Sequence, residues 1–546
     1  MYNKVLNSQT KNITHAAFIL LLASLMSGVL GLLRDRLLAG SFGAGDDLDI
    51  YYAAFRIPDF ISTVLVMGAI SAAIIPIFSS YLVRSREEAW KFFSNLINLF
   101  FISLIVISLI LIIFVPQIFS LIAPGFMGEK KESAIALTRI MFLSPIILGI
   151  SNMISGVIRV FRRFLITSLA PIMYNIGIIF GILFFVPSMG LKGLAWGVVF
   201  GALLHLLIQT PILFKLGFKI DKSFNFLEPG FLKAVKLTLP RAIGLAAGQI
   251  NLIVITAIGS TLAAGSIAVF NLANNLQKLP ITLIGVSFST AAFPFFSLYF
   301  SRQEKDKLIA KFSSVFRQML FLIIPISILI FILRAQIVRI ILGTGKFGWM
   351  DTQLTAACLG VFSFAIFAYA LVLLISKTFY AFHNTKIPAT VTIITVGLNV
   401  ALCYLFIWVL GFENWFRGFL MSLLDLEKLG DGVVIGLPLA LALSGICQVA
   451  LLLIFLYIKM GNFRIREIFE SSVKILASSI LLGFTCYIVR QIVASFVDMQ
   501  TFLGIFIQMS LAGLAGVVVY VVSTLLLKSP EIYALKQAVY RKINGN

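Results

Sequence analysis

Long apolar stretches bounded by charge, glycine or proline dominate the chain from Ala16 to Leu527. Each stretch is at least about 20 residues long, which is the length that an α-helix needs to cross a bilayer. The stretches are continuously apolar, without the alternation of a membrane barrel strand, so helices are favoured. We predict fourteen membrane-spanning helices, at residues 14–41, 55–82, 92–121, 136–158, 164–187, 192–214, 236–260, 265–298, 313–333, 354–381, 387–411, 433–458, 472–494 and 501–527.

Composition narrows the class of protein further. Of the 546 residues, 60% are hydrophobic and 12% are charged, whereas a soluble domain carries about 25% charged residues. This balance excludes a soluble enzyme, a secreted disulfide scaffold and a nucleic-acid binder. The four cysteines lie in apolar stretches without a CxxC spacing, and we expect them to be buried and unreactive.

Motifs of catalysis are absent from the sequence. It holds no Walker motif, no zinc-ligand spacing and no Ser/His/Asp constellation. We therefore expect no enzyme activity and no cofactor. If the chain moves a substrate across the membrane, an ion gradient, the membrane potential or downhill flow would have to drive that movement.

The net charge of +21 is explained mainly by the orientation of the chain in the membrane. With a cytoplasmic N-terminus, basic residues concentrate in the predicted inner segments, such as 215–236, 302–317 and the tail at 528–542. The outer segments hold many of the acidic residues instead. Because Lys and Arg collect in cytoplasmic loops, we predict that both termini are cytoplasmic. Attraction to anionic lipid head groups accounts for the remaining basic excess.

An internal repeat indicates two lobes. The string S-x4-P-x-F-S-x-Y occurs at 71–81 and again at 289–299, each time just before a charged cytoplasmic segment. A weaker similarity joins 158–162 to 379–383. Six predicted helices separate the copies, so both halves enter from the same side and form a parallel repeat. Two such bundles around a central cavity are typical of an alternating-access transporter.

Six basic residues fall inside the predicted spans, where a cation costs about 2.5–3.5 kcal/mol at the bilayer centre. They are Arg34, Arg36, Arg56, Arg139, Arg241 and Lys278. Arg139 and Arg241 lie near helix ends, where a long side chain can reach the interface. The other four are candidates for a binding site.

Arg34 and Arg56 lie at about the same depth on a predicted hairpin that turns near Gly45. Arg34 and Arg36 point about 200° apart on a helix, so they cannot both face one cleft. Asp35 can pair with either arginine, and a purely structural ion pair is the alternative interpretation.

Lys278 shares a helix with three asparagines, and together they form one polar face that looks into a cavity or onto another helix. The asparagines are Asn271, Asn274 and Asn275. A cleft lined by such cations suits an anionic, phosphate-bearing substrate, because the planar arginine fork binds phosphate oxygens bidentately.

Several motifs resemble the MurJ (MviN) family of lipid II flippases. Gly31-Leu-Leu-Arg34-Asp35, Phe42-Gly-Ala-Gly45 and Asp49-Ile-Tyr-Tyr-Ala-Ala-Phe55-Arg56-Ile-Pro58 resemble its first hairpin. Further blocks are Ala123-Pro-Gly-Phe126, Arg139-Ile-Met-Phe142, Gly248-Gln249-Ile-Asn251 and Phe379-Tyr-Ala-Phe382-His-Asn-Thr-Lys386-Ile-Pro388. The blocks occur in the order of the family.

This resemblance implies a MOP-superfamily fold of two six-helix lobes plus two C-terminal helices. The corresponding division is an N-lobe at 1–217, a cytoplasmic linker at 218–235, a C-lobe at 236–459 and a last part at 460–546. It also implies movement of lipid II, the lipid-linked peptidoglycan precursor, from the inner to the outer leaflet of the bacterial plasma membrane. We expect a monomer whose partners are this anionic substrate, membrane lipids and cell-wall synthesis proteins.

The resemblance also assigns residues. Arg34 and Asp35 match the essential pair of the family, Asp49 matches an aspartate before the second helix, and Arg56 matches a cation there. Ser62 and Asn275 stand where the family often has arginines, and Lys278, one turn from Asn275, could supply the second missing charge.

Two alternatives and two local questions stay open. Another MOP transporter, either an oligosaccharide-lipid flippase or a drug exporter, is one alternative, and an inactive homologue acting as a membrane scaffold is the other. Drug export is disfavoured because a cation exporter should offer buried carboxylates and Asp35 is the only clear one in the sequence.

Asp46, Asp47 and Asp49 are expected in a solvated outer loop, with a cation site as the alternative. An apparent outer-loop insertion at 412–432 has no assigned role.

Overall fold

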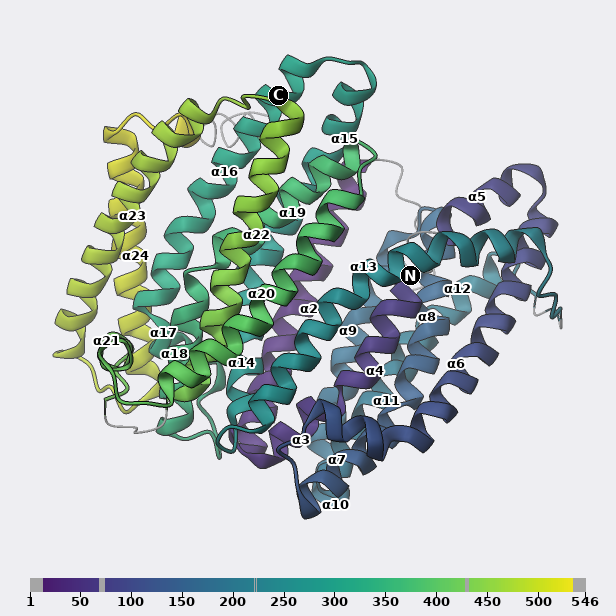
Figure 1. Cartoon of the computed structure of the whole chain (residues 1–546), viewed down its shortest axis with the longest axis horizontal. Coiled ribbons are helices and arrows are strands. Elements are labelled where there is room, and N and C mark those ends of the chain that lie inside the picture. The colour runs from purple at the N-terminus through teal and green to yellow at the C-terminus, as the bar shows by residue number, and fades with distance from the viewer. Residues whose placement is uncertain (1–12, 68–73, 220, 222, 428–431, 534–546) are drawn as a thin grey trace. The chain divides into compact units, whose positions relative to one another are not determined.

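The computed structural model describes residues 13–67, 74–219, 221, 223–427 and 432–533, without the side chains of 13–21, 65–67, 240, 241 and 243. The described residues form helices joined by short loops and contain no strand. Contacts divide the chain into two compact units, Met1–Ala268 (unit 1) and Val269–Asn546 (unit 2). Figure 1 traces the helices of both units.

The length and hydropathy of the helices identify the candidate membrane spans. Among the described residues, ten helices are long and apolar enough to cross a membrane, or up to twelve if two bent pairs each count as one span. The protein is an all-helical, multi-pass membrane protein, which confirms the predicted fold class. The predicted spans 14–41 and 55–82 adjoin or include residues outside the described part. The total of fourteen is compatible with these helices and, like the lobe boundaries, stays a prediction.

Unit 1 consists of short and long helices. They are α2 (Ile13–Phe42), α3 (Asp46–Ala54), α4 (Arg56–Ile61), the π-helix η1 (Ser62–Met67), α5 (Ile75–Arg84), α6 (Arg86–Ile122), α7 (Gly128–Met141), α8 (Leu143–Val160), α9 (Phe164–Phe180), the π-helix η3 (Gly181–Phe185), α10 (Val186–Met189), α11 (Leu191–Leu207), α12 (Thr210–Lys215) and α13 (Pro229–Ser260). The next helix, α14 (Ser266–Pro280), begins in unit 1 and continues into unit 2.

Unit 2 continues with longer helices. They are the π-helix η4 (Ile281–Val286), α15 (Ser287–Ser301), α16 (Lys305–Ile332), α17 (Arg334–Leu342), α18 (Trp349–Ser363), α19 (Ile366–Ala381), α20 (Lys386–Leu410), α21 (Trp415–Leu423), the 3-10 helix η5 (Val433–Ile435), α22 (Gly436–Met460), α23 (Ile465–Ala494) and α24 (Phe502–Leu526).

The repeated sequence string coincides with a repeated break in helical geometry. The π-helix η1 precedes the first copy, with residues 68–73 outside the described part, and η4 precedes the second copy. A π-helical stretch interrupts the regular i→i−4 ladder and bends the helix. The two halves therefore share a local structure as well as a string of residues, which supports the parallel repeat.

Packing in unit 1 centres on aromatic rings and on glycine. Trp90 and Phe93 of α6 pack against Phe78, Phe161 and Phe218, with ring centroids 5.3–5.9 Å apart. Ser85 starts α6, because its hydroxyl accepts hydrogen bonds from the amides of the first turn. These contacts fix the end of the α5–α6 hairpin.

Small residues bring α9 and the π-helix η3 that continues it into backbone contact with α11. Gly177 faces Gly201 and Gly181 faces Gly197, so a Cβ on either Gly177 or Gly181 would overlap the facing backbone. Glycines four residues apart allow this close approach between membrane helices. The seam sets the position of α9, which supplies Asn175 to the site below.

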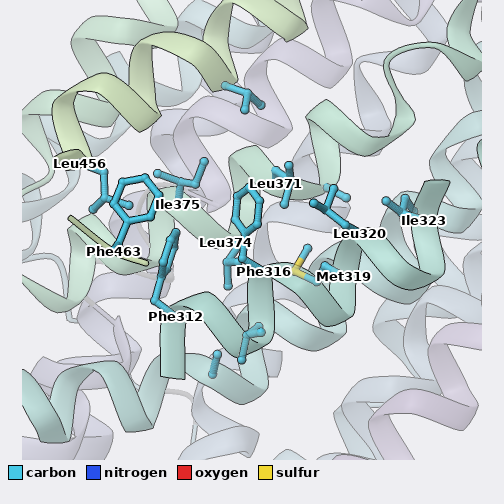
Figure 2. Close-up of a cluster of buried hydrophobic side chains, with 14 of the residues drawn as sticks. Phe312, Phe316, Met319, Leu320, Ile323, Leu371, Leu374, Ile375, Leu456 and Phe463 are labelled. Carbon is cyan, nitrogen blue, oxygen red and sulfur yellow. The ribbon is translucent and has the colours of Figure 1, made fainter. Parts of the chain in front are cut away.

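The core of unit 2 lies between α16, α19 and α22, which run alongside one another in Figure 1. Figure 2 shows Phe312, Phe316 and Met319 of α16 facing Leu374 of α19. The C-terminal helix α24 joins this core, because the hydroxyl of Tyr520 donates a hydrogen bond to the carbonyl of Phe321 at 2.7 Å.

Candidate functional site

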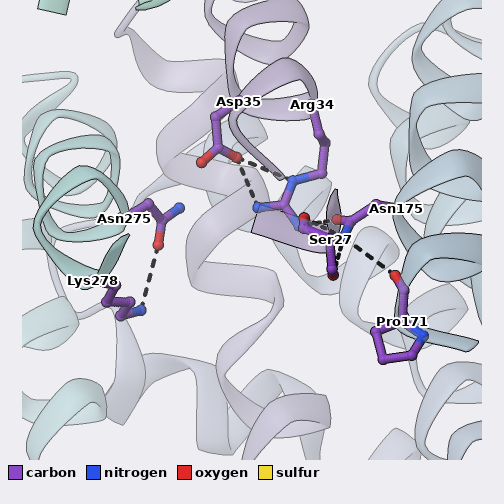
Figure 3. A network of polar contacts seen from close by, with 7 residues as sticks. All are labelled: Ser27, Arg34, Asp35, Pro171, Asn175, Asn275 and Lys278. Atoms are coloured by element: carbon purple, nitrogen blue, oxygen red, sulfur yellow. Dashed lines mark hydrogen bonds and ion pairs between the residues drawn. The ribbon is translucent and has the colours of Figure 1, made fainter. Parts of the chain in front are cut away.

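A polar cluster in unit 1 links α2 to α9, and we call its members, Ser27, Arg34, Asp35 and Asn175, the Arg34 cluster. Nε and Nη2 of Arg34 both donate to Oδ1 of Asp35, at 3.1 and 2.8 Å. Nη1 donates to Oδ1 of Asn175 at 3.2 Å, and Asn175 in turn donates to Ser27 (Figure 3). The predicted pairing of Asp35 is therefore with Arg34.

Hydrogen bonds hold the guanidinium of Arg34 in place without using all of its N–H donors. Its side chain is 22% exposed, whereas that of Asp35 is 4% exposed. Arginine has five N–H donors, and the described residues accept three of those of Arg34. Two N–H groups remain on a fork that already has a fixed direction. This arrangement can receive two oxygens of an anionic group.

Tyr52 adds a polar atom to the surroundings of this cluster. Among the described residues its buried hydroxyl has no hydrogen-bond partner. The charges of Asp35, Arg34 and Arg56 act on this hydroxyl. A buried polar atom without a partner is costly, so the hydroxyl is available to a ligand that reaches it. Sequence reasoning missed Tyr52, because a tyrosine in an apolar segment ordinarily reads as packing.

Arg56 has partners of its own on α13. It is buried, and its Nε donates to Oγ1 of Thr256 at 2.6 Å. A second bond, from Gln249 to Thr63 at 3.0 Å, joins α13 to η1. The charge of Asp59 also acts on Arg56. These contacts tie the bent segment α4–η1 to α13.

Asp49 is a correction to the sequence analysis. The residue is 2% exposed and lies in α3, so it is in a helix and not in a solvated loop. Its carboxylate accepts hydrogen bonds from the amides of Gly265 and Ala268, both at 2.8 Å, and pairs with Lys130 at 3.3 Å. Asp35 is therefore not the only clear buried carboxylate, although that of Asp49 is already bound.

The surroundings of Asp49 also explain why residue 265 is a glycine. Gly265 has φ of +85°, and a Cβ there would overlap the carbonyl oxygen of Ala44. Only glycine fits this position, and it places its amide on the carboxylate. Burial raises the pKa of the Asp49 carboxyl to about 6, because the cost of desolvation exceeds the effect of Lys130 and of the two amides.

In unit 2 the predicted polar face of α14 divides. Asn271 and Asn274 are buried, and Oδ1 of Asn274 accepts a bond from Gln277 at 2.9 Å. Lys278 is exposed, and its Nζ donates to Oδ1 of Asn275 at 3.4 Å (Figure 3). The charge of Lys278 therefore lies beside the position where the sequence lacks a family arginine.

The remaining candidates are less informative. Arg241 belongs to α13, but its side chain lies outside the described part. Arg139 is exposed on α7, and Ser62 is the first residue of η1. No group of three or more His, Cys, Asp or Glu side chains in the described part could hold a metal ion.

Comparison with known proteins decides the family. The family described as Lipid II flippase MurJ matches residues 38–507, which is most of the chain. This chain belongs to the MurJ family. The Probable lipid II flippase MurJ of Buchnera aphidicola subsp. Acyrthosiphon pisum is 31% identical over 385 residues, which cover 69% of this chain and 75% of that protein. The Lipid II flippase MurJ of Burkholderia cenocepacia is 26% identical over 397 residues, covering 71% and 77%.

Solved structures agree with the MurJ assignment. A structure titled "Lipid II flippase MurJ, inward closed conformation" matches with a TM-score of 0.76 and 26% identity, covering 94% of this chain and 99% of that chain. A multidrug resistance MATE family transporter of the MOP superfamily matches with a TM-score of 0.65 and 14% identity, covering 82% and 99%. The latter likeness is one of fold alone.

Proposed function

We propose that this MurJ-family chain is a lipid II flippase, a transporter that moves undecaprenyl-pyrophosphate-linked peptidoglycan precursor from the inner to the outer leaflet of the bacterial plasma membrane. Family membership supports the substrate. The observation that carries the chemistry is the Arg34 fork, which Asp35 and Asn175 hold in place with two N–H groups left over. A fork of this kind suits a phosphate group.

The fork would bind the pyrophosphate of the substrate. A guanidinium keeps its charge at any physiological pH, and its planar donors match two phosphate oxygens. Because Asp35 and Asn175 already fix the direction of Arg34, less side-chain freedom is lost on binding. The hydroxyl of Tyr52 would donate a further hydrogen bond, for which the described residues offer no other acceptor.

The other candidate substrate-binding residues differ in how far the structure supports that role. Arg56 would add positive charge beside Tyr52. Lys278, whose Nζ donates to Asn275, stays a candidate substrate-binding cation of unit 2. Asn274 and Arg241 remain candidates from the sequence alone. Asp49 fits an anchoring role better than direct binding, because Lys130 and two amides occupy its carboxylate.

The proposed cycle is alternating access by two lobes. A parallel repeat with matching π-helical breaks supports two equivalent bundles that move as bodies. In this proposal both termini are cytoplasmic, the protein acts as a monomer and no cofactor takes part. A membrane potential or an ion gradient would supply the energy.

Complementation tests the proposal. The chain is expressed in a bacterium depleted of its own lipid II flippase, beside Arg34→Ala, Lys278→Ala and the control Arg466→Ala. Arg466 is 91% exposed, and its ion-pair partner among the described residues is a neighbour on its own helix, so its loss should be harmless. We expect rescue by the wild type and by Arg466→Ala, and failure of Arg34→Ala at equal membrane levels. Failure of the well-expressed wild type in several hosts would overturn the proposal.

A further inference from the structure

The inserted segment at 412–432 contains a short helix, α21, that lies across the ends of its neighbours. The spans α20 and α22 on either side run within the plane of Figure 1, whereas α21 is seen end-on. The helix begins five residues after the end of the spanning helix α20. Its axis therefore crosses the direction of the two flanking spans, close to where one of them ends.

Both ends of α21 are fixed to unit 2. Asn414 caps its first turn by accepting from the amide of Arg417 at 2.8 Å, and donates to the carbonyl of Val409 at the end of α20 at 2.6 Å. Beyond its last residue, Asp425 pairs with the buried Arg334 at 2.8 Å. These contacts hold the helix at the level of the ends of its neighbours.

One side of the helix packs inward. Leu420 is buried, as are Leu424 and Leu426 just after the helix. Phe416 faces Phe406 of α20, with ring centroids 6.3 Å apart. These side chains pack against the rest of unit 2.

The other side is apolar too, and it is exposed. Trp415, Phe419 and Leu423 follow one another at helical spacing and are 81%, 51% and 39% exposed. The rings of Trp415 and Phe419 are stacked, with centroids 5.8 Å apart. The rings of Trp408 and Phe412, also exposed, lie edge to face at the end of α20, with centroids 5.5 Å apart. We call Trp415, Phe419 and Leu423 the aromatic face.

We propose that α21 is an interfacial helix whose aromatic face lies in the boundary between lipid head groups and acyl chains. Tryptophan is enriched at that depth, because its ring is apolar and its N–H seeks polar partners. Two of the five tryptophans of the chain, Trp408 and Trp415, are exposed at or near the end of α20. The anchorage to Val409 keeps the helix at the end of a span, which favours lipid over a protein partner farther from the membrane.

The position of α21 at the end of a membrane span does not depend on which substrate the protein transports. Under the proposed topology the helix lies at the outer leaflet. There it would fix the depth of the ends of α20 and α22 in the bilayer.

Fluorescence quenching by lipid tests the proposal. The full chain is reconstituted in vesicles of phosphatidylethanolamine and phosphatidylglycerol, with and without bromine near the head-group end of the acyl chains. The difference between wild type and Trp415→Phe gives the emission of Trp415. The same difference for Trp408→Phe gives the reference for an indole at the end of a span. Trp415→Phe keeps an aromatic ring at an exposed position, so the variant should fold normally.

We expect bromine to remove most of the Trp415 emission, to an extent similar to Trp408, and aqueous iodide to have little effect. Strong quenching of Trp415 by iodide without quenching by bromine would overturn the proposal. That result would place the aromatic face in water, as a free surface or as a docking site for another protein.

Discussion

At the residue scale, the central feature is a cation whose partners orient it and leave part of it open. Arg34 uses Nε and Nη2 on Asp35 and Nη1 on Asn175. A compact ammonium cannot make this set of contacts and present a planar pair of donors at the same time. The identity of the side chain should therefore matter as much as its charge.

Arg34→Lys tests this point. We expect transport to fall at least about tenfold, equivalent to about 1.4 kcal/mol, with little change in thermal stability. Arg466→Lys, at an exposed ion pair, should leave both unchanged. The measurement is the rate of lipid II translocation at matched protein levels. Full activity of Arg34→Lys would show that only the charge matters.

Tyr52→Phe separates function from stability. The variant removes a buried hydroxyl that has no partner among the described residues, so melting temperature should stay constant or rise. Transport should fall several-fold if the hydroxyl meets the substrate. Tyr369→Phe is the matched control, because its hydroxyl donates to the carbonyl of Leu441 at 2.7 Å. That variant should lose about 0.5–1.5 kcal/mol of stability and keep its transport. Unchanged transport by Tyr52→Phe would remove Tyr52 from the site.

At the element scale, the joins between helices depend on single groups. The carboxylate of Asp49 on α3 accepts hydrogen bonds from two backbone amides, one just before α14 and one in its first turn. Glycines allow the backbones of α9 and α11 to come into contact. The sequence predicted neither join, because both depend on contacts between distant segments. Gly177, Gly181, Gly197 and Gly201 do show a spacing of four, which could have indicated a close helix pair.

The Asp49 join should depend on pH. Burial raises the pKa of Asp49 to about 6, above the usual value of about 3.9. The folded protein then binds the proton more tightly than the unfolded chain, so stability should fall as pH rises from about 4 to about 6 and then level off. Asp49→Asn should flatten this part of the profile of melting temperature, and Asp46→Asn, at an exposed carboxylate, should not. Identical profiles for Asp49→Asn and wild type would contradict the assignment.

Gly177→Ala should disturb the seam between α9 and α11. A Cβ there overlaps the backbone of Gly201, and such overpacking costs about 1–3 kcal/mol or more. Gly397→Ala in α20 is the control, because no atom lies within 4 Å of its added Cβ. The control should be neutral or stabilising by about 0.5–1 kcal/mol. Thermal unfolding in detergent measures both, and equal stability of the two variants would argue against the seam.

At the scale of the whole molecule, hydropathy predicted the fold class, because a membrane span requires a long apolar helix whatever its neighbours. Adjacency in sequence was enough to suggest the Arg34–Asp35 pair. Asn175, Thr256 and the partners of Asp49 could not be foreseen, since each lies far along the chain from the residue it contacts. The three aspartates before the second span were expected in a loop, because a nine-residue helix was not distinguished from a turn.

The central claim is that this chain moves lipid II across the membrane and that Arg34 grips the substrate. The most direct measurement is the exposure of lipid II to a membrane-impermeant enzyme that cleaves it, in cells depleted of their own flippase. We expect cleavage in cells that express the wild type and protection in cells that express Arg34→Ala at equal membrane levels. Protection of lipid II despite normal levels of the wild type, or equal cleavage with Arg34→Ala, would contradict it.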